Sequence, residues 1–241
     1  MAEQCNKPEF KKNSYIYDIP IPEKRMRNIV AAFAVLCLSL GLKAQKGFYY
    51  GGLFGIGQAS FNSSSLANQS NLLMIGGGVA GTYQFTNYFG LTVNGLVVSK
   101  GTSATGTLQG NIFNPDEDYE ETYRLLYAEV PVMAKLRYGA KGFYGKIFGG
   151  PSFNFNLSGA YDIDYKNSTN KDMSGQKING LKVMETALVY GAGVEVETSA
   201  AGLYSLEFRM SQGLSSIAKT VMGSNDIKNE YFSICLGWSL N

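Results

Sequence analysis

The stretch that decides the fold is EYFSICLGWSL, residues 230–240, in which large and small side chains alternate. Phe232, Ile234, Leu236 and Trp238 are bulky and apolar, whereas the residues between them are Ser, Cys or Gly. A period of two residues indicates a β-strand with two unlike faces. The same alternation occurs in a soluble sheet, with its apolar face inward, and in a membrane-spanning barrel, with its apolar face outward. The rest of the chain decides between these two environments.

The composition favours an all-β protein and removes several kinds of chemistry. The chain of 241 residues contains 29 Gly, 16 Tyr and 14 Phe but no His, and many glycines and aromatic residues are typical of β proteins. Without His, Ser-His-Asp and Cys-His catalysis are excluded, as are most zinc sites. We expect the protein not to be an enzyme and to hold no cofactor or metal.

The N-terminal region has the features of an export signal behind a polar lead-in. The basic segment KRMR precedes the short apolar run NIVAAFAVLCLSLGL, residues 28–42. This order is typical of a secretory signal peptide, and the run is shorter than the about 20 residues of a transmembrane helix. We predict cleavage near Ala44 or Gln45, with 1–44 as lead-in plus signal peptide and 45–241 as the exported domain. Translation starting at Met26 would explain the long polar lead-in.

Export changes the charge balance and the cysteine count. After residue 44 the chain keeps 14 of its 21 Lys and Arg and 15 of its 19 Asp and Glu, a net charge of −1. This balance gives no electrostatic support for a nucleic-acid partner. Cys235 is the one cysteine left, so no intramolecular disulfide can form.

Eight segments of the exported part have the length and pattern of β-strands, and none has convincing helical periodicity. A tilted strand needs about 9–11 residues to cross a membrane, whereas soluble strands average about 5–6. All eight segments reach or exceed the longer figure. The predicted strands are 46–58, 72–85, 88–99, 121–139, 142–159, 181–196, 202–211 and 228–240.

The lengths of the connections alternate between short and long. The short ones are 86–87, 140–141 and 197–201, and the long polar ones are 59–71, 100–120, 160–180 and 212–227. In an up-and-down sheet this places all long connections at one end. Outer-membrane barrels have this asymmetry, with short periplasmic turns and longer external loops. A sandwich with Greek-key connections has no reason to produce it.

We therefore predict an all-β fold, an eight-stranded antiparallel up-and-down transmembrane β-barrel in the outer membrane, with its apolar face in lipid and its signal peptide removed. The alternative is a soluble periplasmic lipid-binding barrel, which would point its apolar side chains inward around a ligand. Release of the protein by osmotic shock would favour the alternative.

The opposite face of the predicted barrel carries charges of both signs. The interior of an eight-stranded barrel is just wide enough for side chains, and an unpaired charge there costs several kcal/mol. We therefore expect a paired charge network in the lumen, and Glu185 also falls on an inward position. The predicted network is Glu129, Lys135, Arg137, Lys146, Glu195, Glu207 and Arg209.

Aromatic residues gather near the short turns and the C-terminal strand. This distribution is typical of the aromatic girdle at a membrane interface, although ordinary core positions would also hold aromatic residues. The predicted interfacial aromatic residues are Tyr83, Phe85, Tyr88, Phe89, Tyr138, Phe143, Tyr144 and Trp238.

Three local motifs have plainer explanations than the functions they suggest. GGGVAG, residues 76–81, has dinucleotide-site spacing but is followed by a strand instead of the required helix. NPDEDYEE, residues 114–121, could attract Ca²⁺, but a solvated loop is the simpler interpretation. Pro131 cannot donate to a strand ladder, so we predict a β-bulge there.

The residues also resemble a known family. TYRLLYAEVPVMAKLRYG followed by GFYGKIFGGPSFNFNLSG is similar to two strands of the PorT-like outer-membrane β-barrel family of Gram-negative bacteria, with Tyr127, Glu129 and Pro131 in the more specific part. LTVNGLVVSKG, GAGVEVE, LEFRMSQGLSSI and the final LGWSL are similar to its other strands, over residues 46–241. The resemblance implies an eight-stranded barrel behind a signal peptide and, through PorT, a link to protein secretion.

We expect a structural or surface-interaction role. Outer-membrane lipids would surround the barrel, and a protein partner would bind through the external loops 100–120 and 160–180. The alternative from the family resemblance is an accessory role in a protein-secretion apparatus. A general porin is unexpected, because water channels need more strands than eight.

Overall fold

The computed structural model describes residues 47–62, 69–108, 117–166, 172–198, 202–218 and 227–241. The predicted lead-in and signal peptide, residues 1–44, lie outside this described part. Within it, no helix is long and apolar enough to cross a membrane. The strands are β1 (Phe48–Asn62), β2 (Gln69–Gln84), β3 (Phe89–Leu108), β4 (Glu117–Ala140), β5 (Phe143–Tyr165), β6 (Met173–Lys177), β7 (Met184–Thr198), β8 (Gly202–Gly213) and β9 (Lys228–Leu240).

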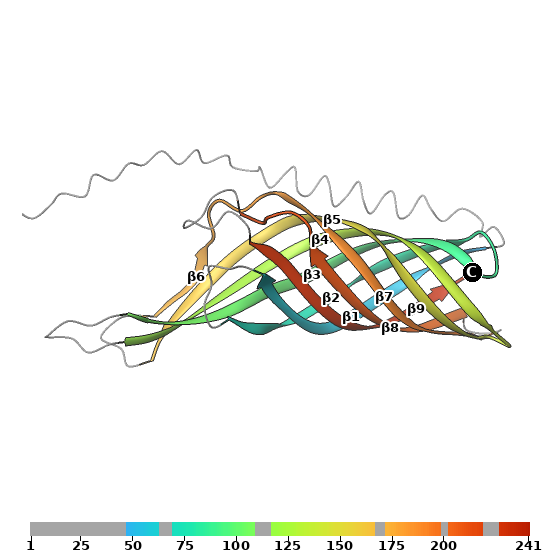
Figure 1. Cartoon of the computed structure of the whole chain (residues 1–241), viewed down its shortest axis with the longest axis horizontal. Coiled ribbons are helices and arrows are strands. Elements are labelled where there is room, and N and C mark those ends of the chain that lie inside the picture. Colours follow the sequence, from blue (N-terminus) through green and yellow to red (C-terminus); the bar gives the residue numbers. More distant parts are fainter. Residues whose placement is uncertain (1–46, 63–68, 109–116, 167–171, 199–201, 219–226) are drawn as a thin grey trace, which may run out of the picture. The chain divides into compact units, whose positions relative to one another are not determined.

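Eight of these strands form a closed antiparallel ring (Figure 1). Each ring strand pairs with its neighbours along the chain, in the order β4-β3-β2-β1-β9-β8-β7-β5, and β4 pairs with β5 to complete the circle. The first and last strands in the chain, β1 and β9, are neighbours in the ring, and their ladder runs from Tyr50↔Leu240 to Asn62↔Lys228. The predicted eight-stranded up-and-down barrel is therefore correct. β6 lies outside the ring and pairs with β5.

Two glycines allow β1 to approach β9 closely. A Cβ atom on Gly51 would lie 1.8 Å from the carbonyl oxygen of Trp238, and one on Gly57 would lie 1.9 Å from that of Phe232. No side chain fits at such distances, and the obstacle is backbone that cannot rotate away. The sequence thus sets the tight packing of this seam.

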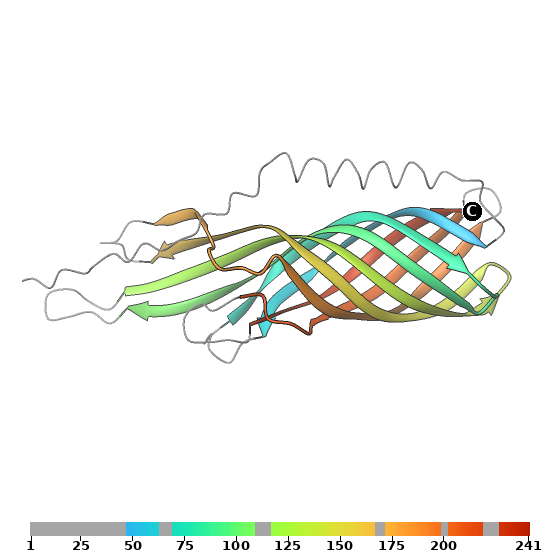
Figure 2. The same cartoon turned by 90° about the horizontal axis from the view of Figure 1, so that it is seen from above.

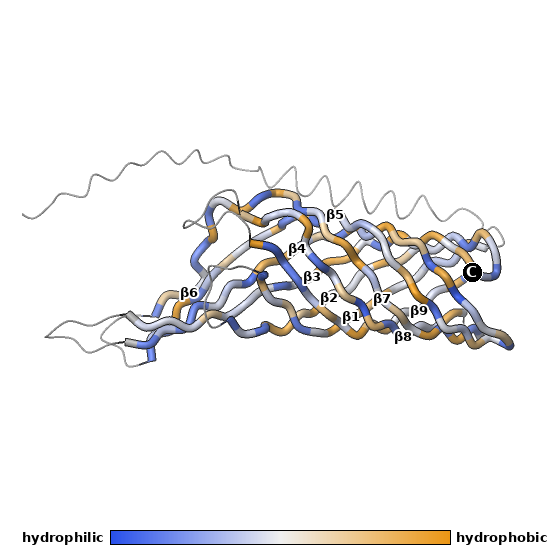
Figure 3. Tube along the Cα trace, viewed as in Figure 1, coloured by the Kyte–Doolittle hydropathy of each residue, from blue (hydrophilic) through white to orange (hydrophobic). Residues whose placement is uncertain are grey.

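The outer face of the ring carries a band of apolar side chains next to the short turns. On β3 it runs from Phe89 to Val97, which are 41% and 50% exposed, and on β9 from Phe232 to Trp238. Apolar and polar positions alternate along these strands in Figure 3. On β3 this apolar band is as long as the about 9–11 residues of a membrane-crossing strand.

Three ring strands continue beyond the apolar band and form what we call the projecting sheet, residues 101–108 of β3, 117–124 of β4 and 160–165 of β5, with β6 at its edge (Figure 2). The β3–β4 ladder continues to Leu108↔Glu117. Within the predicted loops 100–120 and 160–180, the described residues 100–108, 117–120, 160–165 and 173–177 are therefore strand, which corrects the sequence analysis.

Pro131 does not produce the predicted bulge. The β4–β5 register is the same on both sides of it, from Glu129↔Asn154 to Ala134↔Gly149, and the irregularity occurs earlier, between Leu126 and Tyr127. A proline lacks the N–H of a ladder donor. At this position the wall keeps its register without that bond.

Candidate functional site

Apolar side chains face outward from the barrel and charged ones face into the lumen. Ile234 and Leu236 are 53% and 63% exposed, whereas Glu207 and Arg209 on the neighbouring strand β8 are 8% and 2% exposed. This is the arrangement of a barrel in lipid. The alternative of a soluble barrel with an apolar ligand cavity is wrong.

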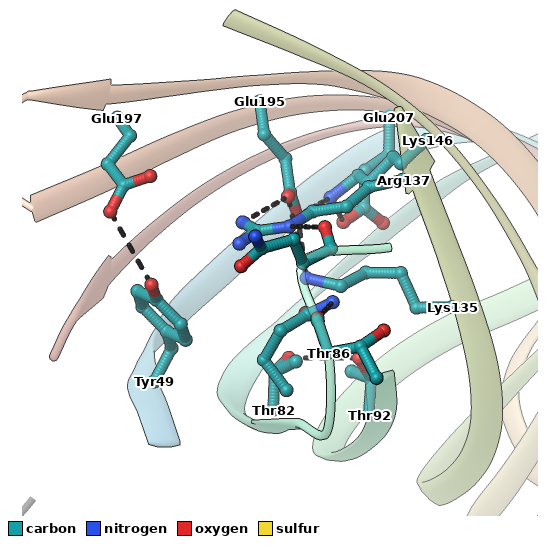
Figure 4. A network of polar contacts seen from close by, with 12 residues as sticks. Tyr49, Thr82, Thr86, Thr92, Lys135, Arg137, Lys146, Glu195, Glu197 and Glu207 are labelled. Atoms are coloured by element: carbon teal, nitrogen blue, oxygen red, sulfur yellow. Dashed lines mark hydrogen bonds and ion pairs between the residues drawn. The ribbon is translucent and has the colours of Figure 1, made fainter. Parts of the chain in front are cut away.

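Six charged side chains meet in the half of the lumen next to the short turns, and we call them the short-turn cluster: Lys135, Arg137, Lys146, Glu195, Glu207 and Arg209. Figure 4 shows the first five with the polar groups around them. They come from β4, β5, β7 and β8, so their contacts connect four adjacent strands of the barrel wall. All six were predicted to face the lumen, and the alternation of these strands places them there.

Glu195 is the centre of the short-turn cluster. Its Oε1 accepts hydrogen bonds from Lys135 Nζ and Lys146 Nζ, both at 3.0 Å, and its Oε2 lies 3.6 Å from Arg137 Nη1. Glu207 accepts from Lys146 Nζ at 2.7 Å and from Arg209 Nη2 at 2.8 Å. The carboxylates of Glu195 and Glu207 thus form ion pairs with all four cationic side chains of the short-turn cluster.

Glu129 belongs to a separate cluster nearer the long connections. Lys100 Nζ lies 2.5 Å from Glu129 Oε1 and 3.2 Å from Glu185 Oε1, and all three side chains are at most 1% exposed. Tyr231 donates to Glu129 Oε2 at 2.9 Å, and Asn229 donates to Glu185 Oε2 at 2.8 Å. The predicted single network is therefore two groups.

Lys100 is the functional residue that the sequence analysis missed, because residues 100–120 were assigned to a loop. Its ammonium also lies 4.7 Å from the centroid of the Tyr127 ring, a cation–π contact. The signal was present in the sequence, since Lys100 shares its face of β3 with the buried Leu96 and Val98.

Tyr144 was predicted in the interfacial girdle, but it faces the lumen. The guanidinium carbon of Arg137 lies 4.5 Å from the centroid of its ring. Tyr144 alternates in phase with Lys146 and Phe148, which are buried inside the barrel. The periodicity of β5 therefore overrides the clustering of aromatic residues in the sequence.

The other predicted girdle residues lie on the outer face or on the short turn between β2 and β3. Tyr83 packs on Phe85 with ring centroids 4.9 Å apart, and Tyr88 stacks on Tyr138 at 6.2 Å. This is the position of an aromatic girdle at a bilayer surface. The outward or turn-borne set is Tyr83, Phe85, Tyr88, Phe89, Tyr138, Phe143 and Trp238, each 41% to 79% exposed.

The lumen is filled with side chains along its length. Leu53, Met74, Leu96 and Val98 form an apolar layer, and on β3 this layer lies between Asn94 and Lys100. Toward the long connections, Ile217 packs on Phe61, Leu125 and Tyr127. In the described part of the chain no three His, Cys, Asp or Glu side chains could hold a metal ion together. The arrangement supplies buried cross-links between strands.

Comparison with solved structures finds bacterial proteins at low sequence identity. Neisserial surface protein A is 12% identical with a TM-score of 0.44, and the match covers 81% of this chain and 99% of that one. Ail, the attachment invasion locus protein of Yersinia pestis, is 12% identical with a TM-score of 0.38 (81% and 100% covered). OprG of Pseudomonas aeruginosa is 13% identical with a TM-score of 0.39 (82% and 97% covered).

A comparison with protein families gives the assignment. No curated protein matches the chain. The model of a family described as outer membrane protein beta-barrel domain matches residues 43–219, well over half of the sequence. Together with the closed ring of eight strands and its apolar outer band, this match identifies the chain as a member of the outer membrane protein β-barrel domain family, located in the outer membrane.

Proposed function

We propose that the protein is a surface-docking protein, in which a rigid, side-chain-filled barrel holds the projecting sheet outside the membrane for a protein partner. The observation that carries this proposal is the continuation of β3, β4 and β5 beyond the apolar band. The β3–β4 ladder keeps its register up to Leu108↔Glu117, and the β4–β5 ladder continues, after one irregularity between Leu126 and Tyr127, to Tyr119↔Tyr165. A flexible loop loses conformational entropy on binding, whereas a preformed sheet has already lost it.

The side chains of the projecting sheet hold it together from strand to strand. Ser103 donates to Glu120 at 2.6 Å and Thr107 donates to Asp118 at 2.7 Å. Arg124 on β4 pairs with Asp162 on β5. These contacts stiffen the sheet across its width.

The projecting sheet also has the residue types of a binding surface. Tyr119 and Tyr165 lie with ring centroids 6.3 Å apart, and Tyr123 and Tyr161 lie 6.1 Å apart. Tyrosine supplies large, rigid contact area at small entropic cost and is enriched at protein interfaces. The half-buried tyrosine pairs are therefore suited to contact a partner.

The orientation follows from the ends of the barrel. Short turns of such barrels lie in the periplasm and long connections lie outside, which places the projecting sheet on the cell surface. Outer-membrane lipids surround the apolar band, and the signal peptide in residues 1–44 directs export.

Photo-crosslinking in intact cells tests the docking role. A photoreactive amino acid replaces Arg124, whose side chain is 61% exposed on the projecting sheet, or Leu236 on the apolar band as the matched control. We expect a discrete protein adduct from position 124 and lipid adducts from position 236. If position 124 and the exposed Asp164 both give no protein adduct, the docking role is wrong.

A second candidate is an accessory role in a secretion apparatus, supported by the resemblance to PorT-like barrels around Tyr127-Ala128-Glu129-Val130-Pro131. Deletion of the gene should then remove secreted proteins from the culture medium. Intact secretion in the deletion strain would eliminate this candidate and leave the docking role unaffected.

The proposed role is not enzymatic. This view is supported by the absence of His from the sequence and by the pairing of Glu129 with Lys100 in the lumen. Turnover of a labelled lipid by the purified barrel, lost on substitution Glu129→Gln, would contradict it.

A further inference from the structure

One glycine on the lipid-facing side of the wall is not required by the packing of the chain itself. Gly52 of β1 occupies an outward position between the exposed side chains of Tyr50 and Phe54. A Cβ atom on Gly52 would lie 3.8 Å from its nearest neighbour, the carbonyl oxygen of Gly78, so a side chain fits there. Gly52 therefore differs from Gly51, where a backbone atom of β9 excludes any side chain.

The usual reasons for a glycine inside a strand do not apply at position 52. The ladders of β1 pass through Gly52↔Val79 and Gly52↔Trp238 without a change of register, so Gly52 does not form a bulge. Gly52 also lacks the positive φ that favours glycine. A glycine in a strand interior otherwise marks a place where another backbone or a ligand approaches closely. The nearest backbone atom in the described chain is 3.8 Å from the Cβ position, so a ligand is the remaining explanation.

The missing side chain at position 52 leaves a groove in the apolar band. The groove has a volume of about 480 Å³ and is lined by residues of β1, β2, β8 and β9, none of which carries a charge. Besides Gly52, its exposed lining residues include the large side chains of Phe54, Tyr204, Leu236 and Trp238. Trp238 is the ladder partner of both Gly52 and Tyr204. An apolar, partly aromatic wall therefore borders the bare backbone of Gly52.

The position and size of the groove restrict what can occupy it. It lies in the apolar band toward the short turns, near the start of β1 and the end of β9, so its occupant comes from the hydrocarbon of the bilayer. A protein interface takes about 20–30 residues a side, whereas nine residues line the groove. A second copy of the barrel would therefore bury too little surface there. A volume of about 480 Å³ lies within the range of about 300–1,000 Å³ for sites of small ligands.

We propose that this groove is a binding site for one fatty acyl chain of a phospholipid in the periplasmic leaflet. The acyl chain packs on the backbone of Gly52 and against Phe54 and Trp238. Because lipid tails are as apolar as the wall, binding depends on van der Waals packing, and a chain in the groove contacts protein atoms on several sides instead of one. The site is independent of the docking role of the projecting sheet, which lies at the other end of the barrel.

Native mass spectrometry of the barrel, extracted from its own membrane with a mild detergent, tests whether a lipid is held. We expect one phospholipid to remain bound to the parent protein. Gly52→Leu fills the groove with a side chain and should lose this lipid. No retained lipid in the parent protein, or equal retention in Gly52→Leu, would overturn the proposal. A retained free fatty acid would overturn the assignment to a phospholipid.

Gly145→Leu is the matched control for the loss of lipid. Gly145 faces outward on β5, a Cβ atom there would lie 3.9 Å from its nearest neighbour, and the residue does not line the groove. This variant adds the same side chain elsewhere on the outer face and should keep the lipid. Heat-modifiable mobility in SDS gels verifies that both variants fold. Equal loss of lipid in both would show that the lipid is not bound in the groove.

Trp238 reports occupancy of the groove, because it lines the groove and is the one tryptophan of the chain. Phospholipid with brominated acyl chains, titrated into the delipidated barrel in detergent, should quench its fluorescence along a curve that saturates at one lipid per barrel. Excess phospholipid without bromine should reverse the quenching. Gly52→Leu should lose the saturable part. Quenching of the parent protein that rises linearly with lipid would indicate ordinary contact with the bilayer and would overturn the proposal.

Discussion

Glu195→Gln offers the sharpest test of the lumen network as a source of stability. The substitution keeps the shape of the side chain and removes the charge that Lys135, Lys146 and Arg137 surround. Four buried cations are then left with Glu207 as the remaining carboxylate of the short-turn cluster. We expect the variant to reach the membrane and to be markedly less stable.

The magnitude follows from burial. Glu195 is 2% exposed, and removing one partner of a buried ion pair costs about 3–5 kcal/mol. With a urea m-value of about 2 kcal/mol per M, the unfolding midpoint should fall by roughly 2 M. Two residues along the same strand, Glu197 is exposed and lies 3.4 Å from the Tyr49 hydroxyl, so Glu197→Gln should change stability by less than about 0.5 kcal/mol.

Urea unfolding of the refolded barrel in detergent micelles or vesicles measures both variants. Adding Lys135→Met to Glu195→Gln should restore part of the lost stability, since it removes one of the unmatched cations and retains the volume. If Glu195→Gln shifts the midpoint no more than Glu197→Gln, the buried charge network does not stabilise the barrel and the reasoning fails.

Three further predictions test which face of the barrel wall contacts lipid and how closely its strands pack. Ile234→Arg puts a charge on the apolar band and should destabilise the barrel in vesicles by about 2–4 kcal/mol; a midpoint equal to the parent's would mean that this face is not in hydrocarbon. Gly51→Ala should prevent normal folding, because its Cβ would lie 1.8 Å from a backbone atom, whereas Gly52→Ala, whose Cβ would lie 3.8 Å from its nearest neighbour, should fold normally. Heat-modifiable mobility in SDS gels distinguishes the folded from the unfolded barrel. Equal behaviour of the two variants would contradict the close approach of β1 and β9. The fluorescence of Trp238, the one tryptophan and 44% exposed, should be quenched by brominated lipids, most strongly by bromine near the headgroup; no quenching would remove it from the interface.

The membrane-crossing part of the fold could be predicted because the lipid imposes a period of two. Along β9, every outward position from Phe232 to Trp238 must be apolar, and every inward one must fit a narrow lumen. This requirement ends where a strand leaves the bilayer, because its outer face then no longer contacts hydrocarbon. Residues 100–108 lack the apolar alternation for this reason. These residues and residues 160–165 were predicted as loops although they are strand.

The candidate site was predictable as a set of residues but not as a geometry. Periodicity placed Glu129 and Glu195 on the inward face, yet it carries no information about which strands lie opposite each other across the lumen. The partner of Glu129 is Lys100, at 2.5 Å, and that contact depends on a lysine beyond the expected end of its strand. For Tyr144 the sequence did contain the answer. Its side chain alternates in phase with the inward Lys146 and therefore faces the lumen, whereas the clustering of aromatic residues wrongly suggested the membrane interface.

The closure of the ring between β1 and β9 has a consequence for biogenesis. The partners Tyr50 and Leu240 are almost 200 residues apart in sequence, so the hydrogen bonds of this seam are the last that a chain emerging from its N-terminus can make. Until β9 pairs with it, β1 keeps one edge with unpaired backbone N–H and C=O groups, to which another chain could bind. The wall of the barrel is therefore complete only when β9 has paired with β1, and an incomplete chain avoids unwanted pairing only if that edge is shielded.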